Sequence, residues 1–424
     1  MRLRGAWLLA VCVAAAAFSS GPRYLVQVAL SGRATDFTRD YVAAAWLAQG
    51  RPLRELDGAT GNAEARRLGA EPVLIPCGPF HLHPPPASLP VRALVPLGFR
   101  GAALAWMILS VLAVALLARL LVALAWPAPR APPAHAVIVA FLALVLWPPT
   151  VMNLAFGQWS AFLATLVVAG WYLLERGRPR SAAAALGAAV TLKSTPAVLL
   201  GYLALRRPRA LAGALAWIAV SVLVAWPLAG GLDAWRVFLR DGRPDVVCWE
   251  AYVDNTVSIT GVLARLFVGG RYIEAPFHAP AVAHVAGPLL ALGLVGVATA
   301  LTWRRARART TAPPDAVREG PLFAMWGALV ALLNPLAWTH NALFLLLPAV
   351  LVARATRQRA TRIALGVALV ALSVPRETLF TLAGPLPFTA ARGWILGVHA
   401  AAGLTIYVCA VVESGRTERA PATR

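Results

Sequence analysis

The 424-residue chain is 59% hydrophobic and only 13% charged, and its 39 Lys and Arg against 18 Asp and Glu give a formal net charge of +21. A soluble domain carries about 25% charged residues, so this composition argues against a soluble protein. The basic residues stand in short runs between apolar segments, which is typical of cytoplasmic loops rather than of a nucleic-acid-binding surface. The sequence therefore predicts an all-α polytopic membrane protein with no nucleic-acid partner.

Apolar segments that approach the length needed to cross a bilayer recur along the chain. We expect spans at about 5–22, 101–126, 135–150, 159–175, 210–228, 280–303, 321–334, 341–354, 363–375 and 391–412. The first segment follows Arg2 and Arg4 and could be a signal peptide, but we expect it to remain as a membrane helix. Together with two shorter pieces described below, this predicts roughly 10–12 helices in one domain over residues 1–412. A cytoplasmic polar tail follows at 413–424.

Arginine-rich runs alternate with arginine-poor or acidic loops, and the positive-inside rule places such runs in the cytoplasm. The runs lie at 175–180, 206–209, 304–309 and 354–362. This orientation places both termini in the cytoplasm and predicts two large external loops, about 23–100 and 229–279, which hold most of the acidic residues. Cys77 and Cys248 fall in these loops, so a disulfide between them is an open alternative that their separation in space decides.

Lys193 is the only lysine of the chain, and it lies in an apolar stretch. Only 25 residues, 181–205, separate two of the cytoplasmic arginine runs, which is too few for two full spans. We therefore expect two half-length helices, about 181–193 and 196–206, with a turn at Lys193–Pro196 that faces protein or a wet cavity. A phosphate would offset the cost of burying this charge. Snorkelling to water or an internal salt bridge is the alternative.

Several other polar residues stand close to predicted membrane helices. Asp36 and Asp40 follow the first span, and a carboxylate there could act as a general base, although a helix cap or a solvated acid is the simpler interpretation. Gln158 and His340 lie in short turns between apolar helices, where polar side chains indicate the mouth of a shared cavity. An interfacial histidine without a catalytic role is the alternative for His340.

The pair His81 and His83 precedes a proline run, and a His-x-His pair could bind a metal ion. The sequence shows no third ligand close by, and the prolines are explained by a rigid approach to the second span. There is also no Asp-x-Asp motif. The sequence therefore predicts no metal site and a metal-independent activity.

Five segments, in this order along the chain, carry a resemblance to a known family. They read TDFTRDYVAAAWLAQGRPL, HPPPASLPVRALVPLGF, FGQWSAFLATLVVAGWYLLERGRPRSAAAALGAAVTLKSTPAVLLGYLALRRPRAL, DNTVSITGVLARL and NPLAWTHNALFLLLP. The chain resembles glycosyltransferase family 87, whose polytopic GT-C enzymes include polyprenol-phosphate-mannose-dependent mannosyltransferases. The resemblance implies a GT-C-type bundle of membrane helices with short or re-entrant helices.

The resemblance also implies a reaction and a site. A sugar, with mannose as the family's example, would pass from a polyprenyl-phosphate donor to a lipid or glycan acceptor on the extracytoplasmic face. Asp36 occupies the position of the catalytic base in an inverting displacement, and Asp40 is the neighbouring acidic candidate. Gln158 and Lys193 match positions that bound the donor cavity, and His340 matches a Trp-x-His position that lines the site. No cofactor and no metal are expected.

The sequence departs from the family pattern at two places. Asn255 and Ser258, candidates for acceptor contacts, are spaced differently from the family's Asn-Gln-Ser segment, and His83 replaces the tyrosine of its Tyr-Pro-Pro. Two other function classes remain as alternatives. A transporter or flippase of lipid-linked or anionic substrates also uses broken helices around a charge, and a noncatalytic scaffold would tolerate neutral replacements at Asp36 and Lys193.

Overall fold

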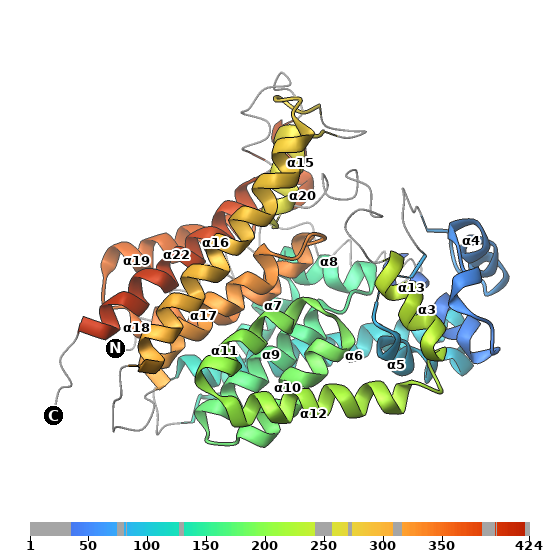
Figure 1. Cartoon of the computed structure of the whole chain (residues 1–424), viewed down its shortest axis with the longest axis horizontal. Helices are drawn as coiled ribbons and strands as arrows, with labels where there is room; N and C mark the ends of the chain where they lie inside the picture. The colour runs from blue at the N-terminus through green and yellow to red at the C-terminus, as the bar shows by residue number, and fades with distance from the viewer. Residues whose placement is uncertain are drawn as a thin grey trace.

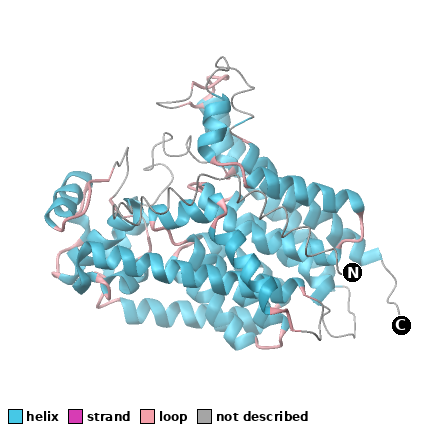
Figure 2. Cartoon of the chain, turned by 180° about the vertical axis from the view of Figure 1, so that it is seen from behind, coloured by secondary structure: helices cyan, strands magenta, loops and turns pink. Residues whose placement is uncertain are grey.

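The computed structural model describes most of the chain. The described residues are 35–73, 80–81, 83–126, 131–241, 257–269, 274–307, 316–383, 395 and 397–419. They form helices and loops with no strand among them (Figures 1 and 2), which confirms the all-α prediction. The predicted first span at 5–22, Asn255, and the cysteines Cys77 and Cys248 lie outside the described residues.

Most of the described helices form two groups that follow each other along the chain (Figure 1). The first group comprises α6 (Gly98–Ala125), α7 (Ala134–Val145), α8 (Pro148–Phe156), α9 (Ser160–Glu175), α10 (Pro179–Leu192), α11 (Leu199–Arg206) and α12 (Pro208–Ala225). The second comprises α16 (Pro280–Arg307), α17 (Ala316–Leu332), the 3-10 helix η5 (Thr339–Leu345), α18 (Leu346–Ala355), α19 (Arg359–Leu372) and α22 (Val398–Arg419). In the first group α9 packs on α6 and α10, and α10 packs on α12. In the second group α22 packs on α17 and α19.

Six further described α-helices, of 5 to 14 residues, flank the two groups. They are α3 (Thr35–Ala48), α4 (Gly58–Arg67), α5 (Ser88–Arg92), α13 (Gly231–Asp241), α15 (Ile259–Phe267) and α20 (Arg376–Ala383). α3 packs against α5, α4 and α6, at the right-hand end of the molecule in Figure 1. Asp233 of α13 accepts an ion-paired hydrogen bond from Arg54 at 3.0 Å, which fastens α13 to the same end.

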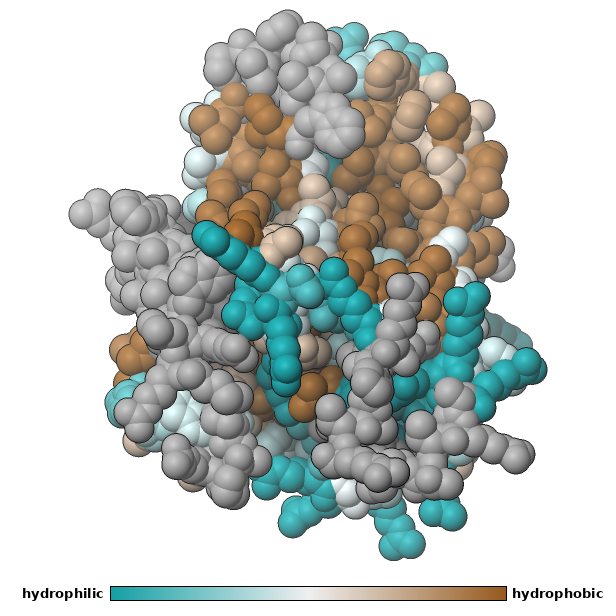
Figure 3. Space-filling view, turned by 90° about the vertical axis from the view of Figure 1, so that its left-hand side faces the viewer, coloured by the Kyte–Doolittle hydropathy of each residue, from teal (hydrophilic) through white to brown (hydrophobic). Residues whose placement is uncertain are grey.

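Four described helices are long and apolar enough to cross a membrane, namely α6, α12, α16 and α22. Their outer faces are apolar: Leu223 is 70% exposed on α12, and Leu292 is 68% exposed on α16. Leaving such side chains in water is unfavourable, whereas lipid accommodates them. Figure 3 shows apolar surface covering a broad part of one face. These features confirm a polytopic membrane protein.

The predicted span at 135–150 is not one straight helix. α7 ends at Val145, α8 begins at Pro148, and the two helices are bent by 64°. Pro148 and Pro149 cause the break, because proline cannot continue a helix from the preceding turn but fits the first positions of a new one. The bent pair makes a fifth candidate span if it crosses as one unit. The span expected at 280–303 forms α16, which has 28 residues, and the other expected spans between 159 and 375 form helices of 7 to 18 residues.

The arginine-bearing ends of several helices meet at one end of the bundle. Nη1 of Arg354, at the end of α18, lies 2.7 Å from Oε1 of Glu175, at the end of α9. Arg206, which ends α11, forms an ion pair with Glu319 near the start of α17. Figure 3, viewed from this side, shows hydrophilic surface gathered below the apolar region. We call this the arginine-rich end.

The chain breaks at Lys193, as the sequence predicts, and then returns to the arginine-rich end. α10 ends at Leu192, and Lys193 has an extended backbone with φ −153° and ψ 134°. α10 and α12 run parallel, because a Cβ at Gly187 would meet Trp217 and a Cβ at Gly213 would meet Ala183. The short helix α11 between them must therefore bring the chain back. At 14 residues α10 is only about 21 Å long, less than the bilayer core of about 30 Å.

Candidate functional site

α3 presents two carboxylates on one face. Asp36 and Asp40 are four residues apart, so their side chains project from successive turns in the same direction. Asp40 is 3% exposed, and Asp36 is partly buried. Phe37 of the same helix stacks on Trp106 of α6, with ring centroids 5.3 Å apart. This packing holds α3 against the first helix group and orients the carboxylates.

The turn between α8 and α9 binds both carboxylates with consecutive residues. α8 ends at Gly157, whose left-handed backbone (φ 67°, ψ 38°) is one that glycine adopts without steric cost. The next side chain, Gln158, donates a hydrogen bond from Nε2 to Oδ2 of Asp36. Trp159 donates from Nε1 to Oδ2 of Asp40 at 2.8 Å. The Gly-Gln turn therefore fixes the positions of both acids.

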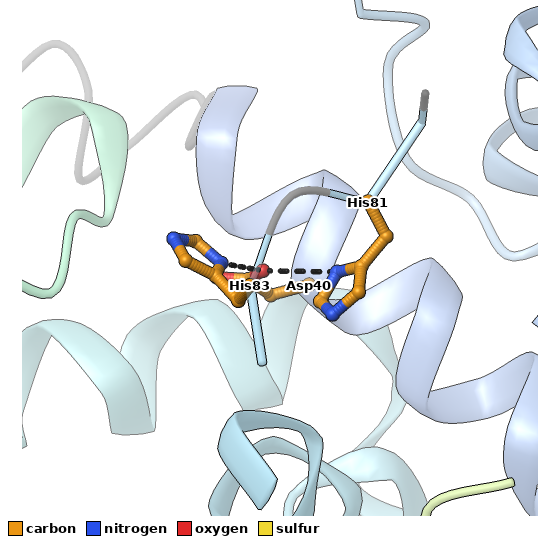
Figure 4. Close-up of side chains that lie close together, drawn as sticks. All are labelled: Asp40, His81 and His83. Atoms are coloured by element: carbon orange, nitrogen blue, oxygen red, sulfur yellow. Dashed lines mark hydrogen bonds and ion pairs between the residues drawn. The ribbon is translucent and has the colours of Figure 1, made fainter. Parts of the chain in front are cut away.

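Two histidines meet the second oxygen of Asp40 (Figure 4). Nδ1 of His83 lies 2.7 Å from Oδ1 of Asp40, and Nδ1 of His81 lies 3.5 Å from the same oxygen. The sequence shows no third candidate ligand near the two histidines, and in the structure Asp40 of α3 lies beside both. The segment is further held by Arg39, whose Nε donates to the carbonyl oxygen of Phe80 at 2.6 Å.

The environments of the two carboxylates shift their pKa values in opposite directions. Burial raises the pKa of Asp36 above its ordinary value, and the charge of Arg39 and the hydrogen bond from Gln158 oppose that rise only in part. Burial would also raise the pKa of Asp40, but the charge and hydrogen bond of His83, together with the charge of His81, bring it well below its ordinary value. Asp36 is therefore the better proton acceptor, because a base works best when its pKa is closer to the operating pH.

Lys193 directly follows α10 and caps its C-terminal end. It is partly buried, and its charge acts electrostatically on Asp36 and Asp40. It also acts on His340. Within the described part of the chain, the Lys193 ammonium forms no ion pair, so the alternative of an internal salt bridge is not found among those residues. A cation without a fixed counter-ion, next to a raised-pKa carboxylate, suits an anionic ligand.

His340 approaches the site from the second helix group. It lies in η5, is 2% exposed, and its Nδ1 has no hydrogen-bond partner among the described residues. Trp338, which precedes η5, meets Phe156 of α8 edge to face with ring centroids 6.0 Å apart. The structure thus gathers five of the six predicted site residues, which are Asp36, Asp40, Gln158, Lys193 and His340. Asn255 lies outside the described residues.

The fold and the site define a polytopic membrane protein with buried acids, an amide and a lone lysine at one end of a helix bundle. The model of glycosyltransferase family 87 matches residues 80–318, more than half of the chain. The chain belongs to this family of glycosyltransferases. No solved structure shows significant similarity to it.

Two mycobacterial relatives share the name polyprenol-phosphate-mannose-dependent alpha-(1-2)-phosphatidylinositol mannoside mannosyltransferase. The protein of Mycobacterium tuberculosis is 32% identical over 303 residues, which cover 66% of this chain and 66% of the relative. The protein of Mycolicibacterium smegmatis is 30% identical over 209 residues, which cover 48% of this chain and 43% of the relative. The chain therefore matches just under two thirds of the first relative and less than half of the second.

Proposed function

We propose that this protein transfers mannose from a polyprenyl-phosphate donor to a hydroxyl group of a lipid or glycan acceptor. The observation that carries the proposal is that Asp36, which accepts a hydrogen bond from Gln158, lies within the electrostatic influence of the Lys193 charge. The relatives' names include polyprenol-phosphate-mannose and phosphatidylinositol mannoside. Those names support mannose as the sugar and a lipid-linked glycan as the acceptor.

The geometry supports a single displacement. Asp36 accepts the proton of the acceptor hydroxyl while that oxygen attacks the anomeric carbon of the sugar. The bond from this carbon to the phosphate oxygen breaks, and polyprenyl phosphate leaves with the electron pair. Lys193 stabilises the charge that develops on the phosphate. One attack from the face opposite the leaving group inverts the anomeric centre, so a single base suffices and no cofactor is required.

The orientation in the membrane follows from the charge distribution. The positive-inside rule places the arginine-rich end, with both termini, in the cytoplasm. α10 starts at this end and carries Lys193 away from it, toward the end where α3 and α13 lie (Figure 1). We therefore place the site on the extracytoplasmic face, where the acceptor is reached from outside.

A transfer assay tests the proposal directly. Membranes bearing wild type, Asp36→Asn or Asp57→Asn receive polyprenyl-phosphate mannose with a labelled sugar, and label in lipid and glycan products is measured. Asp57 is the matched control, because it caps α4 at an exposed position where asparagine caps equally well. We expect a loss of about 10²- to 10⁴-fold for Asp36→Asn, the usual contribution of a general base, and full activity for Asp57→Asn. Undiminished transfer by Asp36→Asn would move the base to Asp40.

The same assay distinguishes a glycosyltransferase from the two alternative functions, a transporter and a scaffold. A transporter or flippase moves the lipid-linked mannose across the membrane without forming a new glycosidic bond, and membership of a glycosyltransferase family does not favour that alternative. A scaffold shows no dependence on Asp36 in either assay. Label that crosses the membrane while still attached to polyprenyl phosphate, with none in new products, would support the transporter.

A further inference from the structure

Asp40, His81 and His83 form a compact cluster next to the proposed base (Figure 4). Their potential ligand atoms, one carboxylate oxygen and one nitrogen from each ring, all lie within 4.8 Å of one another. In Figure 4 both imidazole rings turn a nitrogen toward the carboxylate from opposite sides. We propose that this cluster binds one divalent transition-metal ion of the Zn²⁺ class through Asp40, His81 and His83.

His81 provides the first reason. Its side chain is only 7% exposed, and neither ring nitrogen has a hydrogen-bond partner within the described residues. Nδ1 lies 3.5 Å from Oδ1 of Asp40, which is too long for a good hydrogen bond. A buried imidazole without partners is unfavourable, because it has lost its bonds to water. A metal ion bound to Nδ1 would supply the missing interaction.

The spacing of the ligand atoms is the second reason. Metal–ligand bonds of about 2.0–2.1 Å in a tetrahedral site place ligand atoms about 3.3–3.5 Å from one another. The contact from His81 to Asp40, at 3.5 Å, already has this length. The contact from His83 to Asp40, at 2.7 Å, must open by less than 1 Å. The two histidine nitrogens, which lie within 4.8 Å of each other, must come to the same spacing. The His83 ring is partly exposed and therefore has room to turn.

The surroundings provide outer support for such a site. Trp159 donates a hydrogen bond to Oδ2 of Asp40 at 2.8 Å, which leaves Oδ1 directed at the histidines. Metal-binding carboxylates commonly have a fixed partner of this kind on the second oxygen. His83 also packs edge to face on Trp159, with ring centroids 6.1 Å apart. The cluster therefore has an ordered outer layer before any metal binds.

The ligand set decides the class of metal. Two imidazoles and one carboxylate suit zinc, iron, cobalt or nickel, whereas magnesium and calcium prefer oxygen ligands. Three protein ligands leave a fourth position for water or an anionic oxygen. Two negative and two positive side chains lie in or near the cluster and offset one another: Asp36 and Asp40, and Arg39 and Lys193. The site therefore has no excess of positive charge that would repel a metal ion. A bound ion would link His81 and His83 to α3, one turn from Asp36.

This proposal replaces the expectation of no metal site, and it does not depend on the transfer reaction. The full chain, purified in detergent, is stripped with EDTA, dialysed against Zn²⁺ and then against metal-free buffer, and the bound zinc is counted by mass spectrometry. We expect one Zn²⁺ per chain for wild type and for His278→Ala, an exposed-histidine control. We expect at least tenfold weaker binding for His81→Ala and for His83→Ala.

Co²⁺ provides a readout that needs no variant. Tetrahedral Co²⁺ with nitrogen and oxygen ligands absorbs visible light strongly, so wild type loaded with Co²⁺ should show this absorption, and Zn²⁺ should displace it. Size-exclusion profiles show whether the variants remain folded. Wild type that retains no stoichiometric Zn²⁺ and gives no tetrahedral Co²⁺ absorption would overturn the proposal, as would a folded His81→Ala that binds Zn²⁺ as tightly as wild type.

Discussion

Gln158 controls the proton affinity of Asp36, and removing its amide gives a quantitative test. Its Nε2 donates to Oδ2 of Asp36, and such a bond favours the ionised carboxylate. In Gln158→Leu the ionised form loses this support, so the pKa of Asp36 rises further above its ordinary value. A hydrogen bond to a charged group contributes about 1.5–3 kcal/mol, and one pKa unit equals about 1.36 kcal/mol, which gives a rise of about one to two units.

The pH dependence of kcat/KM for mannose transfer measures this shift. Asp36 must be ionised to accept a proton, so activity is lost as the pH falls through its pKa. The acidic limb of Gln158→Leu should therefore lie about one to two pH units above that of wild type, with activity recovered at higher pH. Gln49→Leu is the matched control, because Gln49 donates to Glu64 away from the site. An acidic limb that does not move, in a folded and active Gln158→Leu, would refute the assignment of Asp36 as the base.

Three further substitutions test the site and the fold. Lys193→Met should lower transfer by about 10²-fold, mainly through weaker donor use, because the phosphate loses its cation, whereas Arg209→Met at the arginine-rich end should leave donor KM unchanged. Glu319→Ala should lower the unfolding free energy by about 3 kcal/mol, because it removes the partner of the partly buried Arg206; an unchanged thermal midpoint would contradict this. Gly157→Ala should lower the unfolding free energy by about 1–2 kcal/mol, since alanine is strained at φ 67°. If its melting temperature falls no more than that of a variant with an exposed helical substitution, this prediction is wrong.

The helices were predictable because local sequence signals determine where they begin and end. α12, expected at 210–228, forms at Pro208–Ala225, between an arginine run and the end of an apolar stretch. The break at Lys193 could be predicted from segment length, because the 25 residues between two arginine runs are too few for two membrane spans. The break between α7 and α8 also had a local signal in Pro148 and Pro149, which the hydropathy pattern concealed.

The polar cluster was not predictable, because its members come from distant parts of the chain. Asp40 and His83 are 43 residues apart, and Asp40 and Trp159 are 119 apart. Their meeting depends on how α3 packs against α6 and the Gly-Gln turn, which no local pattern specifies. Asp36 and Gln158 were singled out for their places beside predicted membrane helices and in the family pattern. The hydrogen bond between them joins residues 122 positions apart, so it could not be read from either segment.

The break at Lys193 also stands at a contact between the two helix groups. α10 packs with α9 and α12, whereas the next helix, α11, packs on α16 and α17 of the second group as well as on α12. The carboxylates stand on α3, which packs on α5, α4 and α6. The separation of the lysine from the acids therefore depends on how the two groups pack together, and substitutions at that contact can change phosphate binding without touching either charge.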